Sequence, residues 1–187
     1  YENFDLPTID AFAELLKENP DLKGLNVTIP YKQAVIPYLD SLHPEAEAIG
    51  AVNTIAFQGG KRIGYNTDVT GFRDSLRPLL TPDDRKALIL GTGGASKAVS
   101  HALEGLGISC SNVSRSPAAG HLGYKALDDP AILERVSVLV NCTPLGTHPN
   151  TDACPPIPYD LLGARLLLYD LVYNPPVSRF LREGLQR

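Results

Sequence analysis

The chain has 187 residues, of which 43% are hydrophobic and 20% are charged, and its formal net charge is −4. This composition is ordinary for a globular protein and excludes disordered and fibrous classes. The negative charge argues against a dedicated nucleic-acid binder, which carries a basic face. No apolar run approaches the roughly 20 residues that cross a bilayer, so we expect no membrane partner. The three cysteines lack metal-ligand spacing, and they predict reduced thiols, a cytoplasmic location and no metal site.

The first part of the chain alternates between helix and strand patterns. Thr8 is a candidate N-cap for a helix whose apolar stripe runs to Leu16. Residues 25–29 alternate apolar and polar side chains, which predicts a short strand. Pro30 then stands where the first position of a second helix is expected, and that helix would carry Lys32.

A hairpin and a domain boundary are predicted next. Residues 51–57 and 61–65 are strand-like, and a Gly-Gly turn separates them. A helix is expected over residues 69–80. The proline-rich polar stretch that follows predicts a boundary between a first domain, residues 1–81, and a second, residues 82–187.

The second part of the chain has the pattern of a doubly wound α/β domain. Its apolar runs are short and alternate with helical patterns, which is typical of a parallel sheet covered on both faces. The expected strands cover residues 86–91, 108–114, 137–141 and 166–170, and the expected helices cover residues 95–106 and 131–135.

A glycine-rich turn links the first of these strands to its helix. It consists of Gly91, Thr92, Gly93, Gly94 and Ala95. Glycine permits positive φ, missing Cβ atoms let a phosphate approach the backbone, and a helix N-terminus offers free N–H groups. The turn therefore indicates the dinucleotide-binding loop of a Rossmann unit. Ser stands at the third motif position, so a plain glycine-rich turn is the alternative.

The end of the next strand bears on the choice of cofactor. NAD-binding units place a carboxylate there, to hold the ribose 2′-hydroxyl. This chain has Ser114, Arg115 and Ser116 instead. A guanidinium beside two hydroxyls suits a 2′-phosphate, which favours NADP over NAD. The alternative is a solvated arginine in a surface turn.

Lys32 and Asp68 are candidates for proton transfer. A carboxylate can orient an ammonium group, whose amine form accepts a proton from a substrate hydroxyl while hydride leaves the same carbon. Asn53 lies in an apolar run, where its amide needs partners. Taken singly, a solvated lysine and a helix-capping aspartate are the simpler interpretations.

Four separated motifs occur in one order along the chain. They are Asn-Val-Thr-Ile-Pro-Tyr-Lys at 26–32, Gly-Ala-Val-Asn-Thr at 50–54, Gly-Tyr-Asn-Thr-Asp at 64–68 and Gly-Thr-Gly-Gly-Ala-Ser at 91–96. Together they resemble the shikimate dehydrogenase family, and residues 141–146 and 169–175 are similar to its later segments. The resemblance runs through nearly the whole chain. It implies a substrate domain joined to a Rossmann-type NADP-binding domain.

The resemblance also implies an activity and residue roles. The family reduces 3-dehydroshikimate to shikimate with NADPH on the route to aromatic amino acids. By this resemblance Lys32 and Asp68 are catalytic and also contact the substrate, together with Thr28, Asn53 and Tyr173. The expected cofactor contacts are Gly91, Thr92, Gly93, Gly94, Ala95, Ser114, Arg115, Ser116 and Leu171. The family commonly has Asn-Arg-Thr where this chain has Ser-Arg-Ser, so the arginine is kept and the asparagine is not.

The chain contains no methionine and starts at Tyr1, so we expect a piece of a longer protein. The resemblance implies that a strand with a Ser-x-Ser motif precedes it and that a helix with a substrate-binding Gln follows it.

The alternatives are a quinate/shikimate paralogue that uses NAD, a non-catalytic sensor of shikimate-pathway compounds, and a piece that has only the fold and no function of its own. A monomer and a homodimer are both compatible with the sequence.

Overall fold

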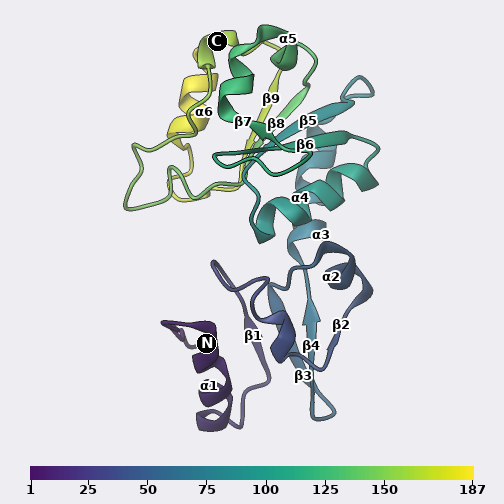
Figure 1. Ribbon diagram of the computed structural model, residues 1–187, viewed down its shortest axis with the longest axis vertical. Coiled ribbons are helices and arrows are strands. Elements are labelled where there is room, and N and C mark those ends of the chain that lie inside the picture. The colour runs from purple at the N-terminus through teal and green to yellow at the C-terminus, as the bar shows by residue number, and fades with distance from the viewer. The chain divides into compact units, whose positions relative to one another are not determined.

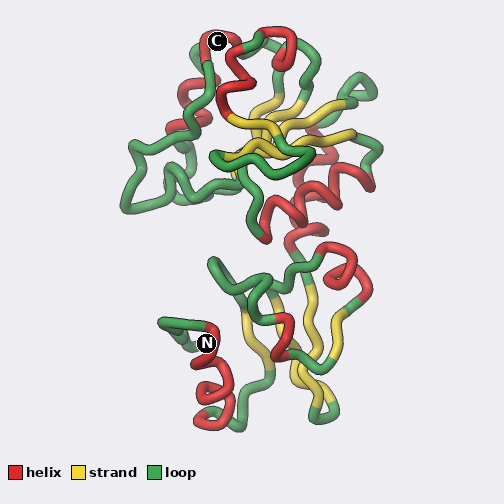
Figure 2. Tube along the Cα trace, viewed as in Figure 1, coloured by secondary structure: helices red, strands yellow, loops and turns green.

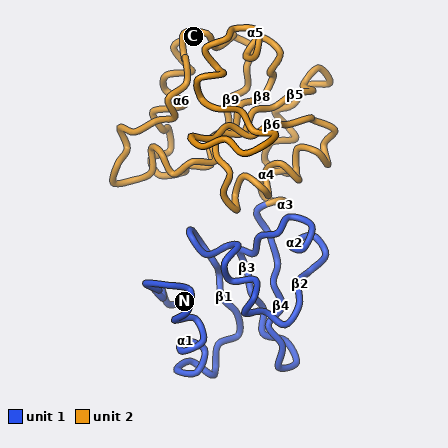
Figure 3. The backbone as a smooth tube through the Cα atoms, in the orientation of Figure 1, with its two compact units in different colours: residues 1–68 blue, residues 69–187 orange.

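The computed structural model describes residues 1–187 (Figure 1). The chain divides into two compact units, Tyr1–Asp68 and Val69–Arg187 (Figure 3). None of the helices is long and apolar enough to cross a membrane. The predicted boundary between residues 81 and 82 concerns which residues bind substrate and which bind cofactor. Compactness alone does not test it, so it stays a prediction.

The first unit is a four-stranded mixed sheet with short helices. Strand order is β1-β3-β4-β2, with β2 parallel to β4 and the other pairs antiparallel. In chain order the elements are η1 (Ile9–Ala11), α1 (Phe12–Glu18), β1 (Gly24–Asn26), η2 (Ile36–Tyr38), β2 (Ser41–Leu42), α2 (Pro44–Ile49), β3 (Thr54–Gln58) and β4 (Lys61–Tyr65). The predicted first helix and the predicted hairpin are both present. The core joins Phe12 and Leu15 of α1 to Val35, Ala46, Val52 and Ile55.

The prediction of a helix after Pro30 is wrong. The segment from Pro30 to Val35 forms turns, and only the 3₁₀ helix η2 follows. The carbonyl of Lys32 accepts the N–H of Val52 at 2.7 Å, so it is engaged outside any helix. Pro37 has no N–H to donate and its ring would clash with the preceding helical turn. Lys32 is therefore on a turn tied to the segment before β3.

The second unit contains a five-stranded parallel sheet, drawn yellow between red helices in Figure 2. Its elements are α3 (Asp68–Leu76, which starts at the last residue of the first unit), η3 (Arg77–Leu79), β5 (Lys86–Leu90), α4 (Gly94–Gly105), β6 (Ser109–Ser114), β7 (Leu122–Gly123), η4 (Tyr124–Asp128), α5 (Pro130–Leu133), β8 (Val138–Asn141), η5 (Tyr159–Leu161), β9 (Leu167–Asp170) and α6 (Arg179–Gly184). The order β7-β6-β5-β8-β9 is that of a doubly wound fold, which confirms the predicted class. The two-residue strand β7 was not among the predicted strands.

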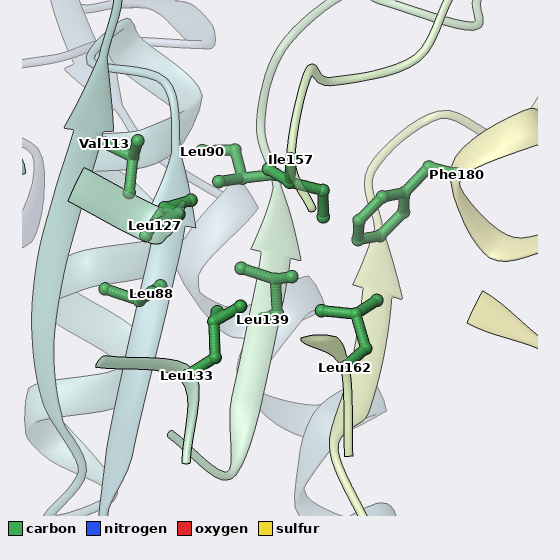
Figure 4. Packing of buried hydrophobic residues seen from close by; sticks show 9 residues of the cluster. All are labelled: Leu88, Leu90, Val113, Leu127, Leu133, Leu139, Ile157, Leu162 and Phe180. Carbon is green, nitrogen blue, oxygen red and sulfur yellow. The ribbon is translucent and has the colours of Figure 1, made fainter. Parts of the chain in front are cut away.

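Apolar side chains on one face of this sheet form a continuous core. Leu88 and Leu90 alternate with Ile89 along β5, so they share a face. Figure 4 shows them packed with side chains from β6, β8 and the covering segments: Val113, Leu127, Leu133, Leu139, Ile157, Leu162 and Phe180. On the helix α3, Phe72 makes an edge-to-face contact with Tyr169 of β9, with ring centroids 5.0 Å apart. Because the strands are buried, their carboxyl ends and the loops beyond are left to carry the chemistry.

Candidate active site

Lys32 and Asp68 meet in the first unit. Lys32 Nζ lies 2.7 Å from Asp68 Oδ2, and 16% of the lysine side chain and 33% of the aspartate side chain are exposed. The two residues are 36 positions apart in the chain, and the fold brings them together without a helix at Lys32. A charge-assisted hydrogen bond of this length fixes the ammonium group while leaving part of the pair accessible. Such a pair can give a proton to an oxygen or take one from it.

Asn53 holds the other oxygen of the same carboxylate. Its Nδ2 donates to Asp68 Oδ1 at 2.8 Å and to Thr67 Oγ1 at 2.9 Å. Its Oδ1 accepts the N–H of Thr67 at 3.0 Å and the hydroxyl of Thr54 at 3.0 Å. Both amide hydrogens therefore have protein acceptors. In this arrangement Asn53 orients Asp68, and a substrate oxygen must displace one of these acceptors to receive a hydrogen bond from it.

Asn66 is a part of the site that the sequence analysis did not identify. Its side chain is buried, with Nδ2 donating to the carbonyl of Ala51 and Oδ1 accepting the N–H of Asp68, each at 3.0 Å. Asp68 begins α3, where the helix N-terminus also favours a negative charge. The available signal was the Asn-x-Asp spacing, which is typical of an asparagine that bonds the backbone two residues later.

The other expected substrate contacts are exposed. Thr28 lies on the segment between β1 and Lys32, and its hydroxyl makes no hydrogen bond within residues 1–187. Tyr173 lies in the second unit, on the loop after β9, with 89% of its surface exposed. Within the first unit Thr28 makes no hydrogen bond to the Lys32–Asp68 pair, so the pair and Asn53 are the expected residues that the structure groups together there.

The turn between β5 and α4 has the shape of a phosphate site. Gly91 has φ +116, and a Cβ there would lie 3.4 Å from the backbone of Cys142. A Cβ at Gly93 would meet nothing within 4 Å, so a side chain there would fill open space in front of the helix. Ser96, at the third motif position, is buried and donates to the carbonyl of Gly93 at 2.7 Å. The residues present therefore fit a nucleotide phosphate, with Ser96 satisfied inside the turn.

Arg115 is available to a ligand. It is exposed in the turn after β6, and its guanidinium makes no hydrogen bond or ion pair within residues 1–187. Ser114 Oγ exchanges hydrogen bonds with the backbone of Ser116 at 3.2 Å and so closes the turn around it. Burial raises the pKa of the nearby Tyr124 phenol, an effect that the positive charge of Arg115 opposes. An unpaired guanidinium in a closed turn suits a phosphate ester.

A polar network fixes the loop that carries Tyr173 and Leu171. Asp170 Oδ1 accepts Asn141 Nδ2 and the N–H of Val172, each at 2.9 Å, and Oδ2 accepts the hydroxyl of Ser178. Burial raises the pKa of the Asp170 carboxyl, and these three donors oppose the rise. Leu171 N–H donates to the carbonyl of Asn141 at 3.1 Å. The sequence analysis assigned no role to this network, although polar residues at the ends of buried strands were the signal.

The chain is similar to known proteins in both sequence and fold. Residues 1–55 match the family model of the shikimate dehydrogenase substrate binding domain. The shikimate dehydrogenase (NADP(+)) of Syntrophomonas wolfei subsp. wolfei is 41% identical over 201 residues, which cover 98% of this chain and 68% of that protein. The chain belongs to the shikimate dehydrogenase family.

Other members of the family agree in sequence and in fold. The shikimate dehydrogenase (NADP(+)) of Clostridium botulinum is 39% identical over 194 residues, which cover 98% of this chain and 74% of that protein. A crystal structure of shikimate 5-dehydrogenase from Thermus thermophilus, in complex with NADP(H) and shikimate, is 35% identical with a TM-score of 0.83. That match covers 100% of this chain and 72% of the other. Family membership makes this chain an NADP-dependent oxidoreductase of the CH–OH class.

Proposed function

We propose that this chain reduces 3-dehydroshikimate to shikimate with NADPH, and catalyses the reverse reaction with NADP⁺. The observation that carries the proposal is the contact of 2.7 Å between Lys32 Nζ and Asp68 Oδ2. A carbonyl reduction needs one proton at the oxygen and one hydride at the carbon. The bound cofactor supplies the hydride. This chain must therefore supply the proton and hold the reacting groups in place.

Lys32 is the proton donor in this proposal. Its ammonium group gives a proton to the C3 oxygen as the carbonyl becomes an alcohol, and the resulting amine regains a proton from solvent. In the oxidation direction the neutral amine accepts the hydroxyl proton. Asp68 accepts a hydrogen bond from Lys32 at one oxygen and from Asn53 at the other. It thereby orients the ammonium group and balances its charge.

The substrate and cofactor contacts in this proposal are the residues that the family resemblance indicates. Thr28 and Tyr173 have hydroxyls that bind no protein group, and both hydroxyls are proposed to bind the substrate. Asn53 is proposed to bind it by giving up one of its two protein acceptors. The turn from Gly91 to Ala95 holds the pyrophosphate, and Leu171 is a further proposed cofactor contact. Ser114, Arg115 and Ser116 hold the 2′-phosphate, and the unpaired guanidinium supports NADP as the cofactor.

The enzyme acts in the cytoplasm, and its three unpaired cysteines support a reducing compartment. Its partners are the two small molecules rather than nucleic acid or a membrane. Sedimentation of the purified chain distinguishes a monomer from a homodimer, both of which are compatible with the sequence.

The test is shikimate-dependent reduction of NADP⁺, followed at the nicotinamide absorbance. NAD⁺ and quinate are assayed in parallel under the same conditions. Turnover with shikimate and NADP⁺, and at least tenfold less with NAD⁺ or quinate, supports the proposal. Preference for quinate and NAD⁺ would identify the paralogue instead. Binding of shikimate without turnover of any pair would indicate a sensor.

A further inference from the structure

Asn112 connects strand β6 to the glycine turn. Its Nδ2 donates to the carbonyl oxygen of Gly91 at 2.9 Å, and the side chain is half-buried. The neighbouring Val113 accepts the N–H of Gly91, also at 2.9 Å. The first glycine of the turn is thus held at both of its backbone polar groups by one strand. The sequence analysis assigned no role to Asn112.

This hydrogen bond sets the direction of a different group. The peptide unit between Gly91 and Thr92 is planar and trans, so the Gly91 carbonyl and the Thr92 N–H point in opposite directions. When Asn112 binds the carbonyl, the Thr92 N–H is turned away from β6. That N–H has no protein acceptor within residues 1–187. It is therefore a free donor whose direction depends on Asn112.

The alternative orientation of this peptide would oppose phosphate binding. A flip of this peptide changes ψ of Gly91 and φ of Thr92, and glycine, here at φ +116, restricts its own ψ less than any other residue does. A flip of the peptide would place the carbonyl oxygen where the N–H now lies, and a carbonyl repels an anion. The flip would also leave Asn112 without its acceptor. The hydrogen bond thus favours the orientation that presents a donor.

We propose that Asn112 is a positioning residue for the nucleotide phosphates, acting through the Gly91–Thr92 peptide without touching the ligand. The assignment rests on the proposed function, because it takes the turn as the pyrophosphate site. Its consequence is specific. The pyrophosphate is common to NADPH and NADH, so loss of Asn112 weakens both by the same factor. Loss of Arg115 weakens NADPH alone, because only NADPH carries the 2′-phosphate.

The experiment compares Asn112→Ala, Asn112→Asp and Arg115→Ala in this chain. Ser111→Ala is the matched control, since Ser111 is the adjacent exposed residue of β6 and makes no side-chain hydrogen bond. Amide hydrogen exchange over residues 90–96 is measured without nucleotide. Dissociation constants for NADPH and NADH are measured by titration of nicotinamide fluorescence, and kcat is measured at saturating NADP⁺.

Expected results follow from the loss of one hydrogen bond. Exchange in the turn becomes faster in Asn112→Ala, both dissociation constants rise together by about three- to tenfold, and kcat stays within about twofold. Asn112→Asp loses at least as much affinity, because an ionised carboxylate cannot donate to the carbonyl. Ser111→Ala matches the unmodified chain.

Three results would overturn the assignment. They are unchanged exchange in the turn, faster exchange with unchanged affinities, and a loss confined to NADPH, which would place Asn112 at the 2′-phosphate. If the unmodified chain binds neither nucleotide, the proposed function fails. Hydrogen exchange then still decides whether Asn112 holds the turn, so the two failures are distinguishable.

Discussion

Asn53 donates its side-chain amide to Asp68 Oδ1 at 2.8 Å, on the carboxylate whose other oxygen binds Lys32. The orientation of the proposed proton donor therefore depends on an amide that does not contact it. Asn66 adds a third constraint, because its Oδ1 accepts the backbone N–H of Asp68. Asp68 is therefore held at both carboxylate oxygens and at its backbone N–H before any substrate binds.

Asn53→Ala is expected to lower kcat by about tenfold, because it removes one hydrogen bond to an ionised group and frees Asp68 to rotate. Asn53→Asp keeps the shape of the side chain but places a second carboxylate against Asp68, so kcat should fall further than in Asn53→Ala. Steady-state rates with shikimate and NADP⁺ measure both. Asn150→Ala, in an exposed loop, is the control. An alanine variant with wild-type kcat would show that Asp68 needs no support from Asn53.

Lys32→Ala is expected to lower kcat by about 10² to 10⁴, the usual contribution of a positioned acid or base. Shikimate affinity should change far less, since the lysine acts on a proton that moves during the reaction. Lys23→Ala, at an exposed site in the same unit, is the control. Isothermal titration with shikimate supplies the second readout. Loss of binding together with turnover would assign the lysine to substrate binding instead.

Asp40 and Arg62 make a pH-dependent contribution to stability. Arg62 donates Nε and a terminal nitrogen to the two Asp40 oxygens, each at 2.9 Å, and its N–H to Oδ2 at 2.7 Å. The hydrogen bonds from the guanidinium hold the pKa of Asp40 well below its usual range. Because the folded-state pKa is the lower one, the stabilisation is fully present above about pH 4 and is lost as the pH falls through the folded-state value.

Asp40→Asn is therefore expected to be less stable than the unmodified chain at pH 7. The difference should shrink as the pH falls from about 4 towards about 2. Urea unfolding across this range measures it, with Asp5→Asn, at an exposed site without hydrogen bonds, as the control. A difference that is constant with pH would assign the effect to something other than the ion pair.

Phe180→Ala is expected to destabilise the second unit by about 3 to 5 kcal/mol, because the ring is fully buried in the core and its removal leaves a cavity. Urea unfolding measures the change in free energy. Leu185→Ala, in the same C-terminal segment but 82% exposed, should change it by no more than about 0.5 kcal/mol. Equal effects at the two positions would contradict the packing of α6 on the sheet.

Local sequence signals determined most elements and several candidate residues. The glycine turn, the hairpin and the apolar strands could be predicted because each depends on backbone preferences or on periodicity within a few residues. The roles of Lys32 and Asp68 could be proposed because their motifs resemble those of the shikimate dehydrogenase family, and the role of Arg115 because a guanidinium suits a phosphate. The doubly wound class followed from the alternation of helices and strands, whereas the position of each strand in the sheet came from the structure.

Only the tertiary structure decided which partners these residues have. The turn at Lys32 replaced a predicted helix because its carbonyl binds Val52, a partner 20 positions away that no local pattern reveals. Asn66, Asn112 and Asp170 acquired roles for the same reason, since each bonds a group brought near by packing of other segments. Hydrogen bonds between distant segments depend on the folded arrangement, so residue type could only identify which side chains needed a partner.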